Sequence, residues 1–256
     1  MKRLFISQHP VFFASANTLN VKRIEKSNYV WWWYALLCSD KYIALCETKG
    51  AASGVDAALL KVFADFGDVR VKSGETLHAA FKRWWTEKVN ADETRGEYLF
   101  AEKLTGNKVE ILTEETAFEE AIDADKVVIS IPKHISRSRI DSAIERILKK
   151  HFSFERGRLT RKPANSTARY HLNKTFDTDV MKLAFACYEE RKHADDNGYK
   201  ITNKEIAEEV GLVVKTKRKD EEIDAYEQSR TVSVKTTRYI TMAQKAIINA
   251  ENGRFG

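Results

Sequence analysis

Four consecutive aromatic residues, Trp31, Trp32, Trp33 and Tyr34, constrain the fold of this chain more than any other feature. They lie in a largely apolar run, residues 29–38, and the preceding Ser27 is a favourable helix N-cap. Because an α-helix has about 3.6 residues per turn, four consecutive aromatic side chains point in all directions around it. At least two of them must therefore lie in a core or an interface. We expect core packing, with a partner surface and the stacking of nucleic-acid bases as alternatives.

The remaining apolar pattern predicts a mainly helical chain with a small β element. Apolar residues recur at helical spacing over residues 55–66, 75–89, 138–151 and 179–192. Residues 108–112 and 126–131 are typical of short strands, and Pro132 ends the second of these.

A break in the periodicity between Phe154 and Ser166 suggests a boundary between two domains. The segment contains Gly157, Pro163 and four cationic side chains, and we interpret residues 154–168 as a basic linker. Residues 1–153 would form a helical and small-β interaction domain, and residues 169–256 a nucleic-acid-binding domain. The linker cations expected to contact phosphates are Arg158, Arg161 and Lys162.

The composition favours a cytoplasmic protein that meets polyanions. The chain has 43 Lys and Arg against 37 Asp and Glu, a net charge of +6, which attracts nucleic acid without selecting a sequence. No apolar run is long enough for a signal peptide or a membrane span. The three cysteines form no Cys-x-x-Cys pair, the six histidines have no metal-ligand spacing, and no phosphate-binding glycine loop occurs. We therefore expect reduced thiols, no cofactor and no metal.

The pattern that points to a function begins at Thr202. Thr202 and Glu205 have the spacing of a capping box, so a helix should start there. Ala207 is a small residue in mid-helix, and Gly211 follows four residues later. This segment is similar to the first half of the helix-turn-helix family, which implies a C-terminal module that binds DNA. The resemblance also implies a turn at Gly211 that needs a positive φ angle.

The resemblance implies a recognition helix after the turn, which we place at residues 232–247 beyond a charged insertion. Ser233 is the expected N-cap, and Thr237, Ile240, Ala243 and Ile247 are the expected inward stripe. The residues expected to contact bases and phosphates on this helix are Ser233, Lys235, Thr236, Arg238, Thr241 and Gln244. The insertion would add phosphate contacts from Lys215, Lys217 and Arg218. The alternative is an all-helical domain whose lysines lie on a solvated face.

A second, looser resemblance covers residues 27–150. Its pattern of Trp33, Tyr42, residues 65–69, Phe81, Trp84 with Trp85, and residues 99–102 looks like uncharacterised bacterial proteins associated with mobile elements. That resemblance implies a prophage or mobile-element origin, and it does not point to any particular activity.

These observations predict a non-enzymatic protein that binds duplex DNA. The expected role is a transcriptional regulator or another DNA-site-binding protein of a bacterial mobile element. The alternatives are a packaging or replication-initiation component that docks DNA for another enzyme, and a metal-dependent nuclease. Since the chain holds one such module, we expect a homodimer through the N-terminal aromatic helices on a palindromic site, against a monomer on an asymmetric one.

Overall fold

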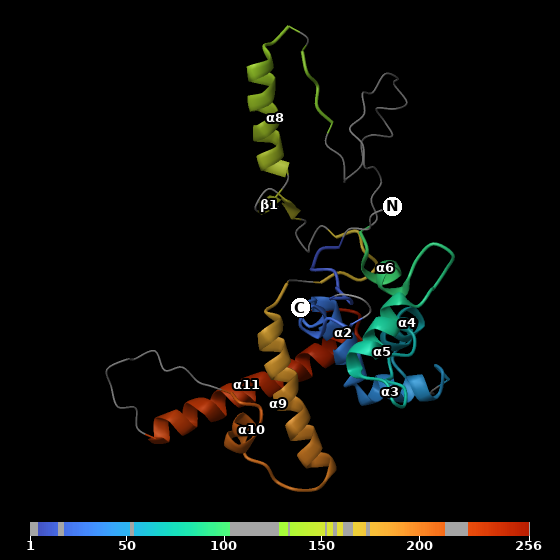
Figure 1. The fold of residues 1–256 in the computed structure, drawn as a ribbon, viewed down its shortest axis with the longest axis vertical. Helices are drawn as coiled ribbons and strands as arrows, with labels where there is room; N and C mark the ends of the chain where they lie inside the picture. Colours follow the sequence, from blue (N-terminus) through green and yellow to red (C-terminus); the bar gives the residue numbers. More distant parts are fainter. Residues whose placement is uncertain are drawn as a thin grey trace. The chain divides into compact units, whose positions relative to one another are not determined.

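The computed structural model describes residues 5–14, 18–51, 54–102, 128–132, 134–151, 153–155, 158–160, 166–172, 175–212 and 225–255. The chain forms two compact units, one from Met1–Ile6 and Phe100–His171, the other from Ser7–Leu99 and Leu172–Gly256. Helices dominate the described residues, and strand structure there is limited to one short antiparallel pair apart from isolated bridges. The predicted class, mainly α with a small β element, is confirmed (Figure 1).

The larger unit is helical. Its helices, in chain order, are α1 (Val21–Ile24), α2 (Asn28–Leu37), α3 (Asp40–Glu47), α4 (Ala57–Phe66), α5 (Leu77–Thr86), most of α6 (Arg95–Phe100), α9 (Thr178–Asp196), α10 (Asn203–Glu209) and α11 (Ala225–Glu251). Several start where a side chain caps the first free N–H groups: Ser27 before α2, Ser39 before α3, Thr76 before α5 and Asp177 before α9. Gly67, with φ of 67°, ends α4 in a conformation that other residues rarely adopt.

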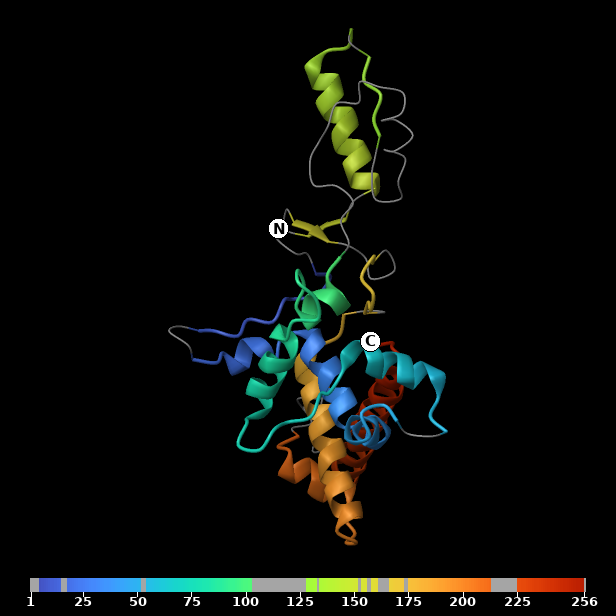
Figure 2. The same cartoon turned by 90° about the vertical axis from the view of Figure 1, so that its right-hand side faces the viewer.

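Helix α2 is the centre of this unit, with α9 and α11 on one side and α4 and α5 on another (Figures 1 and 2). Trp31 stacks on Phe185 of α9, Trp32 stacks on Phe255, and Trp33 contacts Phe81 of α5. The three indoles are at most 7% exposed. A helix that is apolar all round is buried on all sides, so the expected core packing of the aromatic run is confirmed.

This burial corrects the basis of the expected dimer. The expectation of a homodimer rests on aromatic side chains of α2 that cannot all face one core, so that some of them would be exposed. In the structure they are covered by helices of the same chain, and Tyr34, the least buried of the four, lies edge-on to Phe185. The α2 aromatic residues are therefore not available as an interface between two copies.

Segments on both sides of the expected linker belong to one unit. Asn28 of α2 donates from Nδ2 to the carbonyl of Phe176, 3.0 Å away, and its Oδ1 accepts from Ser7 Oγ. Leu172 and Phe255 form a parallel bridge. The structure thus groups residues 7–99 with residues 172–256, because α2 contributes its aromatic residues to the same core as α9 and α11. The proposed division at residues 154–168 does not follow this grouping.

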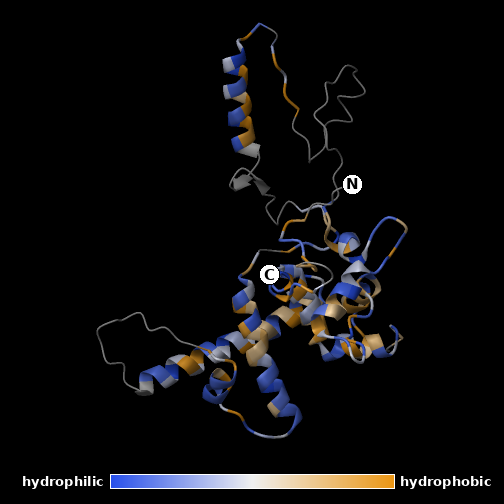
Figure 3. Ribbon diagram, viewed as in Figure 1, coloured by the Kyte–Doolittle hydropathy of each residue, from blue (hydrophilic) through white to orange (hydrophobic). Residues whose placement is uncertain are grey.

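The smaller unit contains α8 (Arg137–His151), β1 (Ser153–Glu155) and β2 (Arg158–Thr160). The strands are antiparallel, with Phe154 paired to Leu159, and all of their residues except Ser153 lie within the segment expected to be linker. Helix α8 has one hydrophobic and one hydrophilic side (Figure 3). The expected strand at 108–112 lies outside the described residues. In the other expected strand, residues 126–131, the described residues 128–131 form no strand.

A buried carboxylate joins two distant segments of the smaller unit. Glu102 is 4% exposed and accepts hydrogen bonds from Ser166 Oγ at 2.6 Å, Thr167 N at 2.9 Å and Thr167 Oγ1 at 3.0 Å. Three donors satisfy a charge whose burial would otherwise be costly. Residues 102 and 166 are therefore held together at the two ends of the intervening chain.

Candidate nucleic-acid interface

Helix α10 has the local geometry that the sequence predicts. Thr202 Oγ1 accepts from Glu205 N at 3.2 Å, and Glu205 Oε2 accepts from Thr202 N at 2.7 Å, so the capping box is complete. Ala207 is 3% exposed, and Gly211 has φ of 66°. The small residue in mid-helix and the left-handed glycine after it are therefore both confirmed as local features.

The start of the next helix differs from the prediction. Helix α11 begins at Ala225, so Ser233 lies inside the helix and is not its N-cap. Residues 225–232 contain neither proline nor glycine, and nothing in them stops a helix from beginning earlier. The rest of the expected insertion, with Lys215, Lys217 and Arg218, lies outside the described residues.

Ser233 instead takes part in a junction of three helices. Asn203, the first residue of α10, donates from Nδ2 to Thr237 Oγ1 at 2.8 Å and to Ser233 O and Ser233 Oγ at 3.3 Å each. Its Oδ1 accepts from an Nη2 hydrogen of Arg191 on α9 at 2.7 Å. One amide thus joins α9, α10 and α11, and Ser233 takes part in this junction through its carbonyl and its hydroxyl.

The apolar contacts below this junction orient α11. Cys187 of α9, Ile206 of α10 and Ile240 of α11 form a buried cluster. Burial raises the pKa of the Cys187 thiol to about 11, so it is a neutral core residue. Ile240, Ala243 and Ile247 of α11 are buried as predicted.

Two threonines of α11 lie on the opposite sides of the helix from those that the sequence predicts. Thr236 was expected to face a ligand, but it is fully buried and its hydroxyl donates to Val232 O at 3.0 Å. Thr237 was expected to face inward, but it is exposed. The reason is the direction of the buried stripe, which runs through residues 236, 240, 243, 247 and 250 at spacings of three and four. Thr236 is therefore not a binding residue.

The exposed side of α11 is basic. Between Gln228 and Ala250 the helix carries Arg230, Lys235, Arg238 and Lys245 and no aspartate or glutamate. Arg230, Arg238 and Lys245 are exposed, and the Lys235 ammonium lies 5.9 Å from the centre of the Tyr239 ring. Thr241 and Gln244, both expected to face a ligand, are exposed on the same helix.

None of these four cations has a carboxylate oxygen within 4.0 Å among the described residues. Several cations elsewhere in the unit are paired: Lys182 with Glu25 at 2.7 Å, Arg95 with Glu87 at 2.9 Å, and Lys192 with Asp40. Helix α11 therefore presents uncompensated positive charge, which favours an anionic partner.

Apolar side chains lie among these cations. Val234 is 53% exposed, Met242 37% and Ile248 56%. A surface that mixes cations, hydroxyl and amide groups with apolar atoms can contact phosphates, base edges and thymine methyl groups. We call Arg230, Val234, Arg238, Thr241, Lys245 and Ile248 the exposed α11 face.

Helix α10 presents the opposite charge. Its exposed residues are Lys204, Glu205, Glu208 and Glu209, and the Lys204 ammonium lies 3.9 Å from a Glu208 oxygen. Three carboxylates against one lysine disfavour contact with a phosphate backbone. On the basis of charge, α11 is therefore a possible surface for an anionic partner and α10 is not.

Of the linker candidates, Arg161 and Lys162 lie outside the described residues, and of Arg158 the structure describes only its position in β2. Sequence reasoning missed Arg230 and Lys245, which precede and follow the predicted contact residues. The absence of acidic residues over residues 228–250 was the signal that could have identified them.

In the part of the chain that the structure describes, no helix is long and apolar enough to cross a membrane. The same residues hold no group of three or more His, Cys, Asp or Glu side chains placed to bind a metal ion. Comparisons of the chain with protein-family models, curated proteins and solved structures found no match.

Proposed function

We propose that this protein binds duplex DNA through the exposed α11 face, in the manner of a helix-turn-helix protein. The observation that carries the proposal is the set of three cations on that face, Arg230, Arg238 and Lys245, that have no carboxylate partner among the described residues, along a stretch without acidic residues. Residues 228–250 extend over about 35 Å of helix, and the major groove of B-DNA admits an α-helix. Cations along that length would replace the counterions condensed on the phosphates.

The role we propose is a transcriptional regulator or another DNA-site-binding protein of a bacterial mobile element, acting in the cytoplasm. Arg238, Thr241 and Gln244 have the side-chain chemistry to distinguish base pairs, and Arg230 and Lys245 would contact phosphates. A palindromic site would need a second copy of the chain. The contact between the two copies would not involve the α2 aromatic residues.

The test begins with selection of bound sites from a random pool of duplexes, followed by titration of a labelled selected duplex. Arg238→Ala should cost about 1–3 kcal/mol of binding free energy at that site if the guanidinium contacts a guanine. Arg230→Gln and Lys245→Gln should weaken binding to all duplexes alike. Each should reduce the slope of log affinity against log salt concentration by about 0.9.

Lys61→Gln is the matched control, because Lys61 is an exposed cation on α4. It should leave affinity and salt dependence close to those of the unchanged protein. If the double variant Arg238→Gln/Lys245→Gln binds the selected duplex as tightly as the Lys61→Gln protein, the proposed interface is wrong. Incubating plasmid DNA with magnesium ions distinguishes a binding protein from a nuclease, because only the nuclease would cut it.

A further inference from the structure

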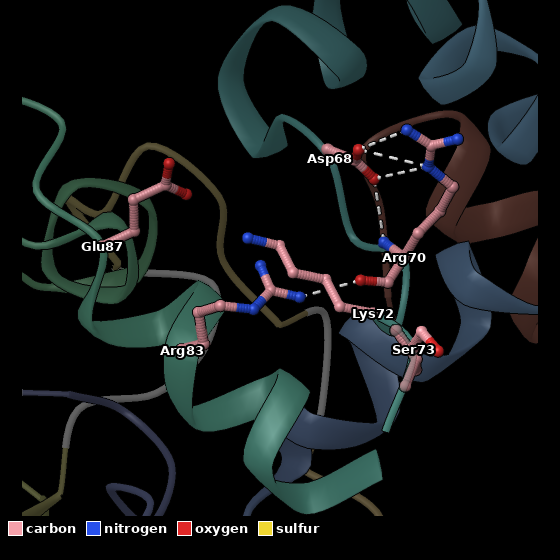
Figure 4. Close-up of a pocket in the computed structure, with 7 residues that line it drawn as sticks. Asp68, Arg70, Lys72, Ser73, Arg83 and Glu87 are labelled. Atoms are coloured by element: carbon pink, nitrogen blue, oxygen red, sulfur yellow. Dashed lines mark hydrogen bonds and ion pairs between the residues drawn. The ribbon is translucent and has the colours of Figure 1, made fainter. Parts of the chain in front are cut away.

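The loop between α4 and α5 borders a polar pocket that no sequence motif indicated. The pocket has a volume of about 470 Å³. One lining residue is apolar and the others are charged or hydroxylic: Asp68, Arg70, Val71, Lys72, Ser73, Arg83 and Glu87 (Figure 4). We call these residues the α4–α5 pocket.

The carboxylates of this region are each matched by an arginine. Asp68 pairs with Arg70 at 2.7 Å and Glu87 pairs with Arg95 at 2.9 Å. Glu75, beside the pocket, pairs with Arg83 at 3.0 Å, and the hydrogen bond from Arg83 holds the pKa of Glu75 below its usual value. Each of these three carboxylates therefore already has a cationic partner.

Lys72 is the cation left over. It is exposed, and its ammonium has no carboxylate oxygen within 4.0 Å in the part of the chain that the structure describes. Lys72 and Arg83 both line the pocket, and Figure 4 draws their side chains among the lining residues. A pocket lined by a cation without a carboxylate partner and by a second cation attracts an anion.

Hydrogen bonds hold one edge of the Arg83 guanidinium in place. Its Nε donates to Glu75 Oε1 at 3.0 Å, and its Nη2 donates to Glu75 Oε2 at 3.0 Å and to the Arg70 carbonyl at 2.8 Å. Its Nη1 has no hydrogen-bond acceptor among the described residues. A guanidinium fixed along one edge and open along another loses little further freedom when it binds an oxyanion.

We propose that the α4–α5 pocket binds the phosphate group of a small polar phosphorylated molecule, through Lys72 Nζ and Arg83 Nη1. Phosphate accepts several hydrogen bonds and carries the charge that these cations lack. The pocket is larger than a phosphate requires, and its volume lies within the range of small-molecule sites. Its polar lining, with Val71 as the apolar member, suits a sugar-like remainder better than an aromatic one. The proposal does not depend on DNA binding.

The test is calorimetric titration of the full chain with inorganic phosphate and with ribose 5-phosphate, at ionic strength held constant with chloride. Both should bind, and ribose 5-phosphate should bind more tightly because its sugar occupies the remaining volume. Lys72→Gln should weaken both by about fivefold, the upper range for an exposed ion pair. The Lys72 side chain is exposed, so this change should leave the thermal unfolding temperature unaltered.

Lys61→Gln again serves as the control and should bind both compounds like the unchanged protein. Absence of binding, or equal affinities of the Lys72→Gln and Lys61→Gln proteins, overturns the proposal. A Lys72→Gln protein that loses affinity for duplex DNA but keeps its affinity for ribose 5-phosphate also overturns it, since the pocket would then hold a backbone phosphate.

Discussion

The Nδ2 group of Asn203 donates a 2.8 Å hydrogen bond to Oγ1 of Thr237, and this contact joins the start of α10 to the middle of α11. The same side chain also contacts Ser233 and Arg191. Because one amide connects three helices, its loss leaves several polar groups with weaker partners. The position of α11 relative to α10 therefore depends on this junction as well as on the apolar cluster beneath it.

Asn203→Ala should lower the free energy of unfolding by about 1–2 kcal/mol, since two or more hydrogen bonds in a partly buried site are lost. Urea denaturation measures this change. Asn249→Ala is the control, because Asn249 is an exposed residue of α11, and it should change stability by less than about 0.5 kcal/mol. Equal effects of the two substitutions would show that the junction contributes no stability.

Trp31→Ala should reduce stability and leave the oligomeric state unchanged. The indole stacks on Phe185 at a centroid distance of 5.9 Å, and its Nε1 donates to Glu25 O at 2.8 Å. Removing a buried tryptophan costs about 3–5 kcal/mol. Phe13→Ala, at a side chain that is 46% exposed, should cost far less. Light scattering should give the same mass for both variants and the unchanged protein, and a dimer dissociated by Trp31→Ala alone would restore α2 as the interface.

Thr236→Val and Thr241→Val separate the buried side of α11 from its exposed side. Thr236 is fully buried, so its substitution should leave affinity for a selected duplex unchanged and alter the unfolding free energy by less than about 1 kcal/mol. Thr241 is exposed on the proposed DNA-binding face, so its substitution should weaken binding to that duplex. The reverse pattern in a titration would show that the opposite side of the helix meets DNA.

The cysteines should react slowly with alkylating reagents. Burial, followed by the charge of Glu189, raises the pKa of Cys38 from 9.0 to about 12, and burial raises the pKa of Cys46 to about 11. At pH 8 the Cys38 thiolate fraction falls from about a tenth to about one in ten thousand. Iodoacetamide labelling should be slow in the folded protein and fast in guanidinium chloride. Labelling of Cys38 at the same rate in both conditions would contradict this prediction.

The same pKa shifts give a direction for stability against pH. A thiol whose pKa is raised in the folded state makes a contribution to the unfolding free energy that is fully present at pH values below its usual pKa of 9.0. As the pH rises above 9.0 the unfolded chain ionises first, and the contribution is lost by about pH 12. The unfolding free energy measured in urea should therefore fall over this interval, and Cys38→Ala should flatten the decline.

Local patterns in the sequence determined most helices and their ends. Ser27 and the Thr202–Glu205 pair cap helices as predicted, and Gly211 adopts positive φ. These features depend on neighbours a few residues away, so the sequence contains the information directly. The buried positions of Ile240, Ala243 and Ile247 follow from spacing for the same reason.

Only the tertiary structure decided what covers each surface. The sequence predicts that the aromatic residues of α2 lie in a core and, in part, at an interface. Their burial depends on α9 and Phe255, which are more than 100 residues away in the chain. Thr236 and Thr237 are adjacent, and the rotation of α11 against α9 and α10 places one inside and the other outside. The pairing of Arg83 with Glu75 likewise depends on how the loop folds over α5, as does the lack, among the described residues, of a carboxylate oxygen within 4.0 Å of the Lys72 ammonium. Long-range packing is a sum of many weak contacts between distant residues, and local sequence does not contain it.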